Sequence, residues 1–246
     1  KILPGSSDDL KILEINIEEK ATGEVVAGAG VGTDGTSFMF SVSENNWLGR
    51  GIKLQSSLNL SEEQISGDLL VENPNYNFSG NSVFASIDVS STDRAAVSGY
   101  ESTKTGASLG TTFEQYRNVY LSPYLSGAFE DITVDATASD SVKKMKGNFT
   151  NLDLGYSIIW DKRNQPFQPT AGYRTKFEQQ LPILQDSSSI INGVNVSKYH
   201  AFSEDMIGSL KFKAKSIHGV DDDVRLTNRL FLPSKSLRGF NTRKTG

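Results

Sequence analysis

Few side chains in this sequence have the type and spacing that catalysis or cofactor binding requires. The segment 30–35 matches the glycine pattern G-x-G-x-x-G, which in a nucleotide-binding protein precedes a helix whose N-terminus faces the phosphates. Here an alternating pattern typical of a strand follows, so we interpret the segment as a hairpin turn. The histidines His200 and His218 lack the serine and aspartate arrangement of a catalytic triad. We therefore assign no catalytic, cofactor-binding or metal-ligating residue.

One segment carries lysine at every second position, as Lys211, Lys213 and Lys215, with apolar residues between them. In a strand these lysines share one face. If the strand crosses a membrane, they must line an aqueous lumen, because a lysine facing lipid at the midplane costs about 2–4 kcal/mol. In a soluble sheet, the same lysines would protect an edge strand against aggregation.

The composition resembles that of a soluble, mildly acidic protein. The 246 residues include no cysteine, 29 acidic and 25 basic side chains and 37% hydrophobic residues, and the mean hydropathy is −0.35. No apolar run approaches the roughly 18 residues of a membrane helix, which excludes a helical membrane protein. The absence of cysteine excludes disulfide scaffolds, and the net charge of −4 gives no electrostatic case for nucleic-acid binding. A membrane β-barrel is compatible with this composition, because only alternate residues of its strands are apolar.

Alternation of apolar and polar residues is the dominant pattern, and it predicts about eleven strands with no convincing helix. The predicted strands are 24–33, 37–43, 52–60, 65–72, 83–90, 106–113, 118–126, 151–160, 173–181, 196–203 and 210–215. The pattern is least clear in the segment 196–203. Aromatic residues gather near the strand ends, as interfacial girdles do.

The predicted connections alternate between compact and long, which is typical of an outer-membrane barrel with short turns at one rim. The compact connections are 45–50, 73–80, 114–118, 162–172 and 203–206, and the long ones include 90–102, 130–148 and 184–195. The alternative is a soluble β-sandwich or lipocalin-like barrel, whose strands also alternate. The aromatic residues near strand ends and the polar character of the second face favour the membrane barrel.

Several stretches resemble one family, the BamA-type outer-membrane assembly proteins. The segment 231–240 resembles the family's sixth extracellular loop, through its signature residues Leu237, Arg238, Gly239 and Phe240. The segment 161–172 resembles the turn after the eighth strand, through Asp161, Arg163, Pro169 and Gly172. The segment 45–51 resembles the first periplasmic turn, and 9–23 resembles the tail of the last POTRA domain, a periplasmic module.

The resemblance implies an all-β fold, a transmembrane antiparallel β-barrel of 16 strands. This chain supplies about eleven of them, and an open sheet of eleven would leave unpaired edges in lipid. We therefore expect part of a barrel, in which 1–23 is the C-terminal tail of the last POTRA domain with its linker. Residues 24–246 would then be the N-terminal part of the barrel, ending in the sixth loop.

The resemblance also implies a function and a location. Family members are integral to the bacterial outer membrane and help unfolded outer-membrane proteins to fold and insert, without enzymatic activity or a cofactor. The implied partners are unfolded outer-membrane protein clients, accessory lipoproteins of the assembly complex and the lipid bilayer. Alternatives within the superfamily are a TamA-like factor and a two-partner-secretion pore. A passive porin-type channel is an alternative from a different class.

Two site hypotheses follow from the resemblance. The family opens a lateral seam at its first strand, here 24–33, and Gly28, Gly30 and Gly32 would weaken the packing of that strand. In the family the loop arginine, here Arg238, meets acidic or polar groups on the inner wall. Asp153 and Glu178 lie on predicted luminal faces and are candidate partners for it.

Overall fold

A computed structural model describes residues 1–4, 7, 9–18, 20–32, 35–185, 188–220 and 223–230. Two short strands come first, β1 (Ile2–Pro4) and β2 (Lys11–Leu13). The long strands are β3 (Gly23–Gly32), β4 (Gly35–Trp47), β5 (Ile52–Ser61), β6 (Gln64–Tyr76), β7 (Asn81–Arg94), β8 (Tyr100–Tyr116), β9 (Val119–Val134), β10 (Gly147–Asp161), β11 (Gly172–Gln185), β12 (Ser189–Ala201) and β13 (Ile207–Gly219). The helical segments are α1 (Ala95–Ser98), α2 (Asp140–Lys143) and the 3₁₀ turn η1 (Leu226–Asn228).

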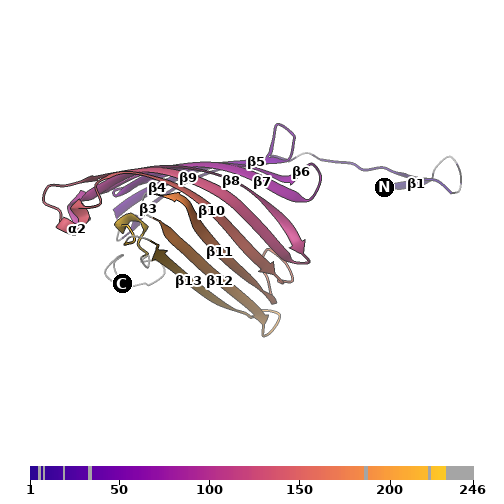
Figure 1. Cartoon of the computed structure of the whole chain (residues 1–246). Coiled ribbons are helices and arrows are strands. Elements are labelled where there is room, and N and C mark those ends of the chain that lie inside the picture. Colours follow the sequence, from indigo (N-terminus) through magenta and orange to yellow (C-terminus); the bar gives the residue numbers. More distant parts are fainter. Residues whose placement is uncertain are drawn as a thin grey trace.

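Strands β3 to β13 form one antiparallel sheet, in which each strand pairs with its neighbours in the sequence. The sheet is strongly curved, and within the described residues β3 and β13 are its two edges (Figure 1). Its strands are 10 to 17 residues long, and about 9–11 residues suffice to cross the hydrocarbon of a membrane when tilted. The eleven strands predicted from the alternating pattern are therefore confirmed, including the strand with the least clear pattern, which is β12.

The two faces of the sheet differ in polarity, because successive side chains of a strand point to opposite sides. On β10, Leu154, Ile158 and Trp160 are 45%, 40% and 42% exposed, whereas Asp153 and Ser157 on the other face are buried. Neighbouring strands add exposed apolar side chains to the same outer face, among them Phe38, Phe40, Ile65, Ile87, Leu109, Phe129 and Phe212. The sheet therefore has an apolar outer face and a polar inner face.

The sheet has no conventional hydrophobic core. Among the described residues, Tyr100 and Ile132 are the only buried apolar ones. A soluble β-sandwich buries two apolar sheet faces against each other, and the described chain has no second sheet that covers this one. A continuous exposed apolar surface instead marks contact with a membrane or a partner. No helix in the described part of the chain is long and apolar enough to cross a membrane.

For two of the three connections predicted to be long, the predicted length is wrong. β7 continues to Arg94 and β8 begins at Tyr100, so the connection predicted at 90–102 shrinks to 95–99. Likewise, the connection predicted at 184–195 shrinks to 186–188. In the first case, strand pairing continues beyond the apolar belt through polar residues, which give no alternating signal. In the second case, the adjacent apolar residues Ile190 and Ile191 interrupt the alternation. The connection predicted at 130–148 remains the longest of the three, at 135–146, and contains α2.

The N-terminal segment forms a small structure of its own. β1 pairs with β2 in a two-stranded antiparallel sheet, with Ile2 opposite Leu13. Its apolar side chains are exposed, Ile15 and Ile17 to 69% and 83%. Figure 1 shows the segment extending away from the sheet, at the end opposite α2. The assignment of 1–23 to the tail of a POTRA domain stays a prediction.

Candidate functional site

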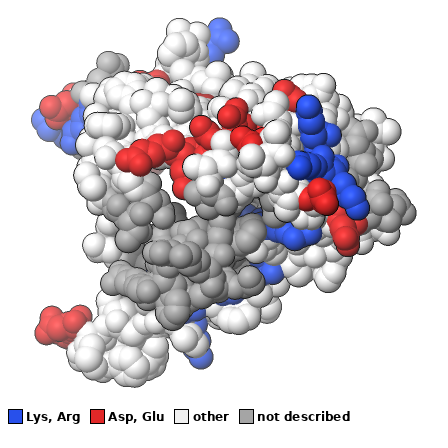
Figure 2. All heavy atoms as spheres, turned by 90° about the vertical axis from the view of Figure 1, so that its left-hand side faces the viewer, with Lys and Arg blue, Asp and Glu red and all other residues white. Residues whose placement is uncertain are grey.

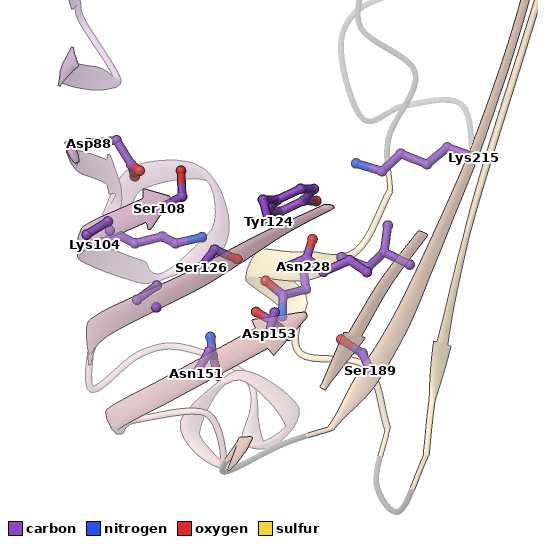
Figure 3. Close-up of a pocket in the computed structure, with 16 residues that line it drawn as sticks. Asp88, Lys104, Ser108, Tyr124, Ser126, Asn151, Asp153, Ser189, Lys215 and Asn228 are labelled. Carbon is purple, nitrogen blue, oxygen red and sulfur yellow. The ribbon is translucent and has the colours of Figure 1, made fainter. Parts of the chain in front are cut away.

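The curve of the sheet encloses a polar cavity of about 370 Å³. Its lining comes from every strand from β7 to β13 and from Asn228, which follows β13 (Figure 3). Asp88, Lys104, Asp153 and Lys215 contribute the charged groups. A cavity bordered by so many neighbouring strands lies inside the curve, so these side chains define the inner face of the sheet.

The lysines predicted to line a lumen occupy alternate positions of β13. Lys215 lines the cavity, and its amine is turned into it in Figure 3. All three lysines stand opposite small or polar residues of β12, namely Ser197, Asn195 and Gly193. On the outer face of β13, Leu210 and Phe212 are 73% and 58% exposed. The described geometry thus separates the lysines from the apolar face, and their contact with an aqueous lumen stays a prediction.

The strand predicted to form a seam is β3, the first edge of the sheet. β3 and β4 pair up to Gly32 opposite Gly35, so the glycine pattern at 30–35 joins two strands and precedes no helix. Gly28 and Gly30 lie on the inner face, opposite Met39 and Ser37. A Cβ atom added at Gly28 would be 4.0 Å from Met39 Cε, and one at Gly30 would be 3.5 Å from Ser37 Oγ. No bulky neighbour therefore explains these two glycines.

The turn between β10 and β11 contains a tight charged cluster. Arg163 donates two hydrogen bonds to the Asp161 carboxylate, from Nε to Oδ1 at 2.8 Å and from Nη2 to Oδ2 at 2.6 Å. Its Nη1 also donates to the carbonyl oxygen of Pro166 at 3.1 Å, and Arg174 Nε lies 3.6 Å from Asp161 Oδ2. The hydrogen bonds to Asp161 raise the pKa of Arg163 above its usual value. The structure thus brings together two of the four residues singled out in this turn.

Of the other two residues of the turn motif, Gly172 has a role in the backbone and Pro169 has none that its contacts define. Gly172 has a φ of +95°, and a Cβ atom there would overlap the carbonyl oxygen of Lys162, so the close return of the chain requires glycine. Pro169 lies in the loop between the two strands, and no contact of its side chain defines a role for it. Asn164 also stabilises this loop and was not predicted: its Oδ1 accepts hydrogen bonds from the backbone N–H groups of Thr170 and Ala171, both at 3.2 Å.

A row of polar side chains crosses the otherwise apolar outer face from β10 to β13. The Tyr156 hydroxyl donates to Gln179 Oε1 at 2.9 Å, and Gln179 Nε2 donates to Asn192 Oδ1 at 2.6 Å. Asn192 Nδ2 donates to Ser216 Oγ at 3.5 Å. These residues are direct cross-strand neighbours, so the register of the sheet places them side by side. We name them the outer polar row.

The residues of the predicted sixth loop, Leu237, Arg238, Gly239 and Phe240, lie outside the described residues, and the role of Arg238 stays a prediction. A different arginine, Arg225, reaches the inner wall after β13 and is 5% exposed. Its Nη1 lies 3.5 Å from Oε2 of Glu130 on β9. Neither residue belongs to a motif, so the contact between Arg225 and Glu130 could not be predicted from the sequence. Asp153 and Glu178 as partners of Arg238 stay a prediction.

The comparisons with known proteins agree with this geometry. Residues 46–246 match the family model described as the Omp85 superfamily domain. Over 242 residues, the chain is 25% identical to the outer membrane protein assembly factor BamA of Neorickettsia risticii (strain Illinois), covering 94% of this chain and 32% of that protein. The chain thus spans about a third of the length of this curated relative.

Two solved structures have a similar fold. The crystal structure of BamA from Haemophilus ducreyi lacking POTRA domains 1–3 matches with a TM-score of 0.68 and 20% identity, covering 83% of this chain and 42% of that one. CdiB from Acinetobacter baumannii matches with a TM-score of 0.54 and 11% identity, covering 89% and 42%. The family match covers most of the chain and includes ten of the eleven strands that follow the N-terminal segment, in part or whole. The chain therefore belongs to the Omp85 superfamily, as part of a β-barrel integral to the bacterial outer membrane.

Proposed function

We propose that this barrel acts in the assembly of outer-membrane proteins, as a BamA-like insertase that opens a seam at β3. The observation that carries the proposal is the character of β3, an edge strand whose inner face has glycines that no neighbouring side chain requires. Further support comes from the distant similarity to the assembly factor BamA over 94% of the chain.

The proposed mechanism uses the backbone of the edge strand. An unpaired edge presents N–H and C=O groups that pair with an incoming strand by β-augmentation. Glycine weakens a strand because it adds conformational freedom and no side-chain packing. At Gly28 and Gly30, β3 can therefore exchange partners with little loss of side-chain contact. The client's own burial and hydrogen bonding in the membrane supply the energy, so the step needs no catalytic residue and no cofactor.

The partners in this proposal follow from the same function. The clients are unfolded outer-membrane proteins, and the apolar outer face contacts the lipid bilayer. Accessory lipoproteins of an assembly complex and the periplasmic POTRA domains belong to the proposal through the family resemblance alone. In this proposal the segment 1–23 is the connection to the last POTRA domain, and nucleic acid has no role.

A second candidate is a translocation pore of the same superfamily, either TamA-like or of the two-partner-secretion type. The observation that favours it is the fold similarity to CdiB, at a TM-score of 0.54. A passive porin-type channel would conduct ions steadily and would show no dependence of client folding on β3. Three measurements therefore distinguish the candidates: release of a secreted substrate for the translocation pore, client insertion for the insertase, and steady conductance for the porin-type channel.

The experiment replaces Gly28, Gly30 and Gly32 by valine in the full-length protein. We expect the yield of a folded reporter barrel to fall severalfold, because a side chain at these positions removes the conformational freedom that glycine gives the strand. The reporter's folding is measured by its altered migration on a gel without heating. Unchanged reporter assembly would contradict the proposal.

The matched control replaces Ala27 and Ala29 by valine. These residues lie on the outer face of the same strand, opposite Phe40 and Phe38. The control adds apolar bulk to β3 while it retains the glycines, so reporter assembly should stay near the wild-type level. The folding of each variant barrel itself is verified on the same gels, which separates a loss of function from a loss of structure.

A further inference from the structure

The segment that follows β13 returns to the inner wall of the sheet, where Arg225 contacts side chains of β9 and β10. Arg225 Nη2 donates a hydrogen bond to Asn151 Oδ1 at 2.8 Å, and its Nη1 lies 3.5 Å from Glu130 Oε2. The centre of the guanidinium group lies 4.3 Å from the ring centroid of Phe149, in cation–π contact. Thr227 Oγ1 donates a hydrogen bond to Glu130 Oε2, at 3.4 Å.

This contact is unusually well buried for a charged pair in so open a structure. The side chains of Arg225 and Glu130 are each 5% exposed, whereas every other ion pair between described residues has side chains that are at least 18% exposed. Burying a charge is unfavourable unless it is paired and hydrogen-bonded, and losing one partner of a buried pair is strongly destabilising. The segment 223–230 therefore depends on Arg225 and Glu130 together.

The local structure of the segment turns this contact into an anchor. Backbone N–H groups of Asn228 and Arg229 donate to the carbonyl oxygen of Arg225, at 3.0 and 3.1 Å, so the chain folds tightly around the anchoring residue. Asn228 consequently lines the cavity together with Asn151, Asp153 and Lys215 (Figure 3). Seen from the end of the sheet where α2 lies, acidic side chains form a run along one side and basic ones gather at another (Figure 2).

We propose that Arg225 and Glu130 form a latch that holds the segment 223–230 across the cavity, and that breaking the latch exposes the cavity. The latch links a segment after β13 to a strand 95 positions earlier in the sequence, so it constrains the segment independently of strand pairing. The proposal rests on the inner-wall contacts and does not require the insertase function. It concerns Arg225 and β9, and it is separate from the hypothesis on Arg238.

The test measures access to the cavity through a single introduced cysteine, since this chain contains none. Asn228→Cys is introduced into the full-length protein in outer-membrane vesicles, and its reaction with a bulky maleimide is followed by gel shift. We expect slow labelling with Arg225 present, and an increase of about tenfold or more with Arg225→Ala or Glu130→Gln, because each leaves a buried charge without its partner. Arg225→Lys should give an intermediate rate, because lysine keeps the charge and loses the planar fork.

The matched control is Arg229→Ala, which removes an exposed arginine from the same segment. Arg229 Nε donates only locally, to the Val224 carbonyl oxygen at 3.3 Å, so labelling of Cys-substituted position 228 should not change. Equal labelling rates in the wild-type, Arg225→Ala and Glu130→Gln backgrounds would overturn the proposal, as would an equal increase with Arg229→Ala. Gel migration without heating verifies that each barrel is folded, and Glu130→Gln decides the matter if Arg225→Ala fails to fold.

Discussion

Within the described residues, β3 and β13 are the two edges of the sheet, yet their side chains connect them to their neighbours very differently. β3 pairs with β4 along its 10 residues, and at Gly28 and Gly30 it contributes no side chain to that pairing. Ser216 of β13 is the last residue of the outer polar row, which begins at Tyr156 on β10. The segment that follows β13 contacts the inner wall through Arg225. Backbone hydrogen bonds join all the strands, so the difference arises from side chains. The sheet is cross-linked near its last strands and weakly connected at its first.

Glycines of the inner face show the same contrast. Gly110 and Gly155 lie on either side of Tyr124, and a Cβ atom at Gly110 would be 2.7 Å from Tyr124 Cβ. At Gly155 an added Cβ would overlap the tyrosine ring itself. These two glycines make room for an aromatic ring that packs against the inner wall. Gly28 and Gly30 have no such neighbour, so side-chain packing requires the glycines of β8 and β10 but not those of β3.

The largest expected effect comes from Gly155→Ala compared with Gly28→Ala. Both substitutions reduce backbone freedom equally, so the difference between them isolates the collision with Tyr124. We expect Gly155→Ala to be less stable than Gly28→Ala by about 1–3 kcal/mol, as for overpacked sites. Urea unfolding of the barrel in phospholipid vesicles, followed by tryptophan fluorescence, measures both free energies of unfolding. Equal values would mean that the inner wall is no better packed at β10 than at β3.

A smaller effect is expected from breaking the outer polar row with Gln179→Leu. Leucine suits the lipid-facing surface, but it leaves the Tyr156 hydroxyl and Asn192 without their shared partner. Side-chain hydrogen bonds in membranes contribute little individually, so we expect a loss of about 1 kcal/mol in the free energy of unfolding. Thr175→Val on the same face of β11 is the control and should have almost no effect. A stabilised Gln179→Leu barrel would show that the row does not tie β13 to its neighbours.

The sequence predicted the eleven strands well, because a lipid-facing strand must be apolar at every second position. Ile52–Ser61 was predicted almost to the residue for this reason. The ends of β7 and β8 were underestimated, since their outer parts, such as Asp93 paired with Glu101, continue the ladder through polar residues. Alternation thus predicts the part of a strand that lies inside the apolar belt, and it does not predict where the strand ends beyond the belt.

The candidate site was harder to predict, because its contacts join residues that are distant in the sequence. Asp161 and Arg163 are two positions apart and belong to a recognisable turn, so both were singled out from the sequence, although their contact was not predicted. Glu130 and Arg225 belong to no motif, and only the curvature of the sheet brings them together. The outer polar row could not be predicted either, since it depends on the register of four strands, which alternation alone does not determine.

The smallest effect is also the one that relates stability to function. Gly28→Ala should stabilise the barrel by about 0.5–1 kcal/mol, because alanine lowers the conformational freedom of a strand residue. The added Cβ fits, with Met39 Cε 4.0 Å away, so no strain offsets the gain. If the looseness of β3 is needed for exchange with clients, the same variant should assemble a reporter barrel more slowly, as in other cases where stability and activity oppose each other. Measuring unfolding and reporter assembly on one variant separates the effect of Gly28 on stability from its effect on client assembly. A more stable barrel with unchanged assembly would mean that assembly does not depend on the glycine at this position.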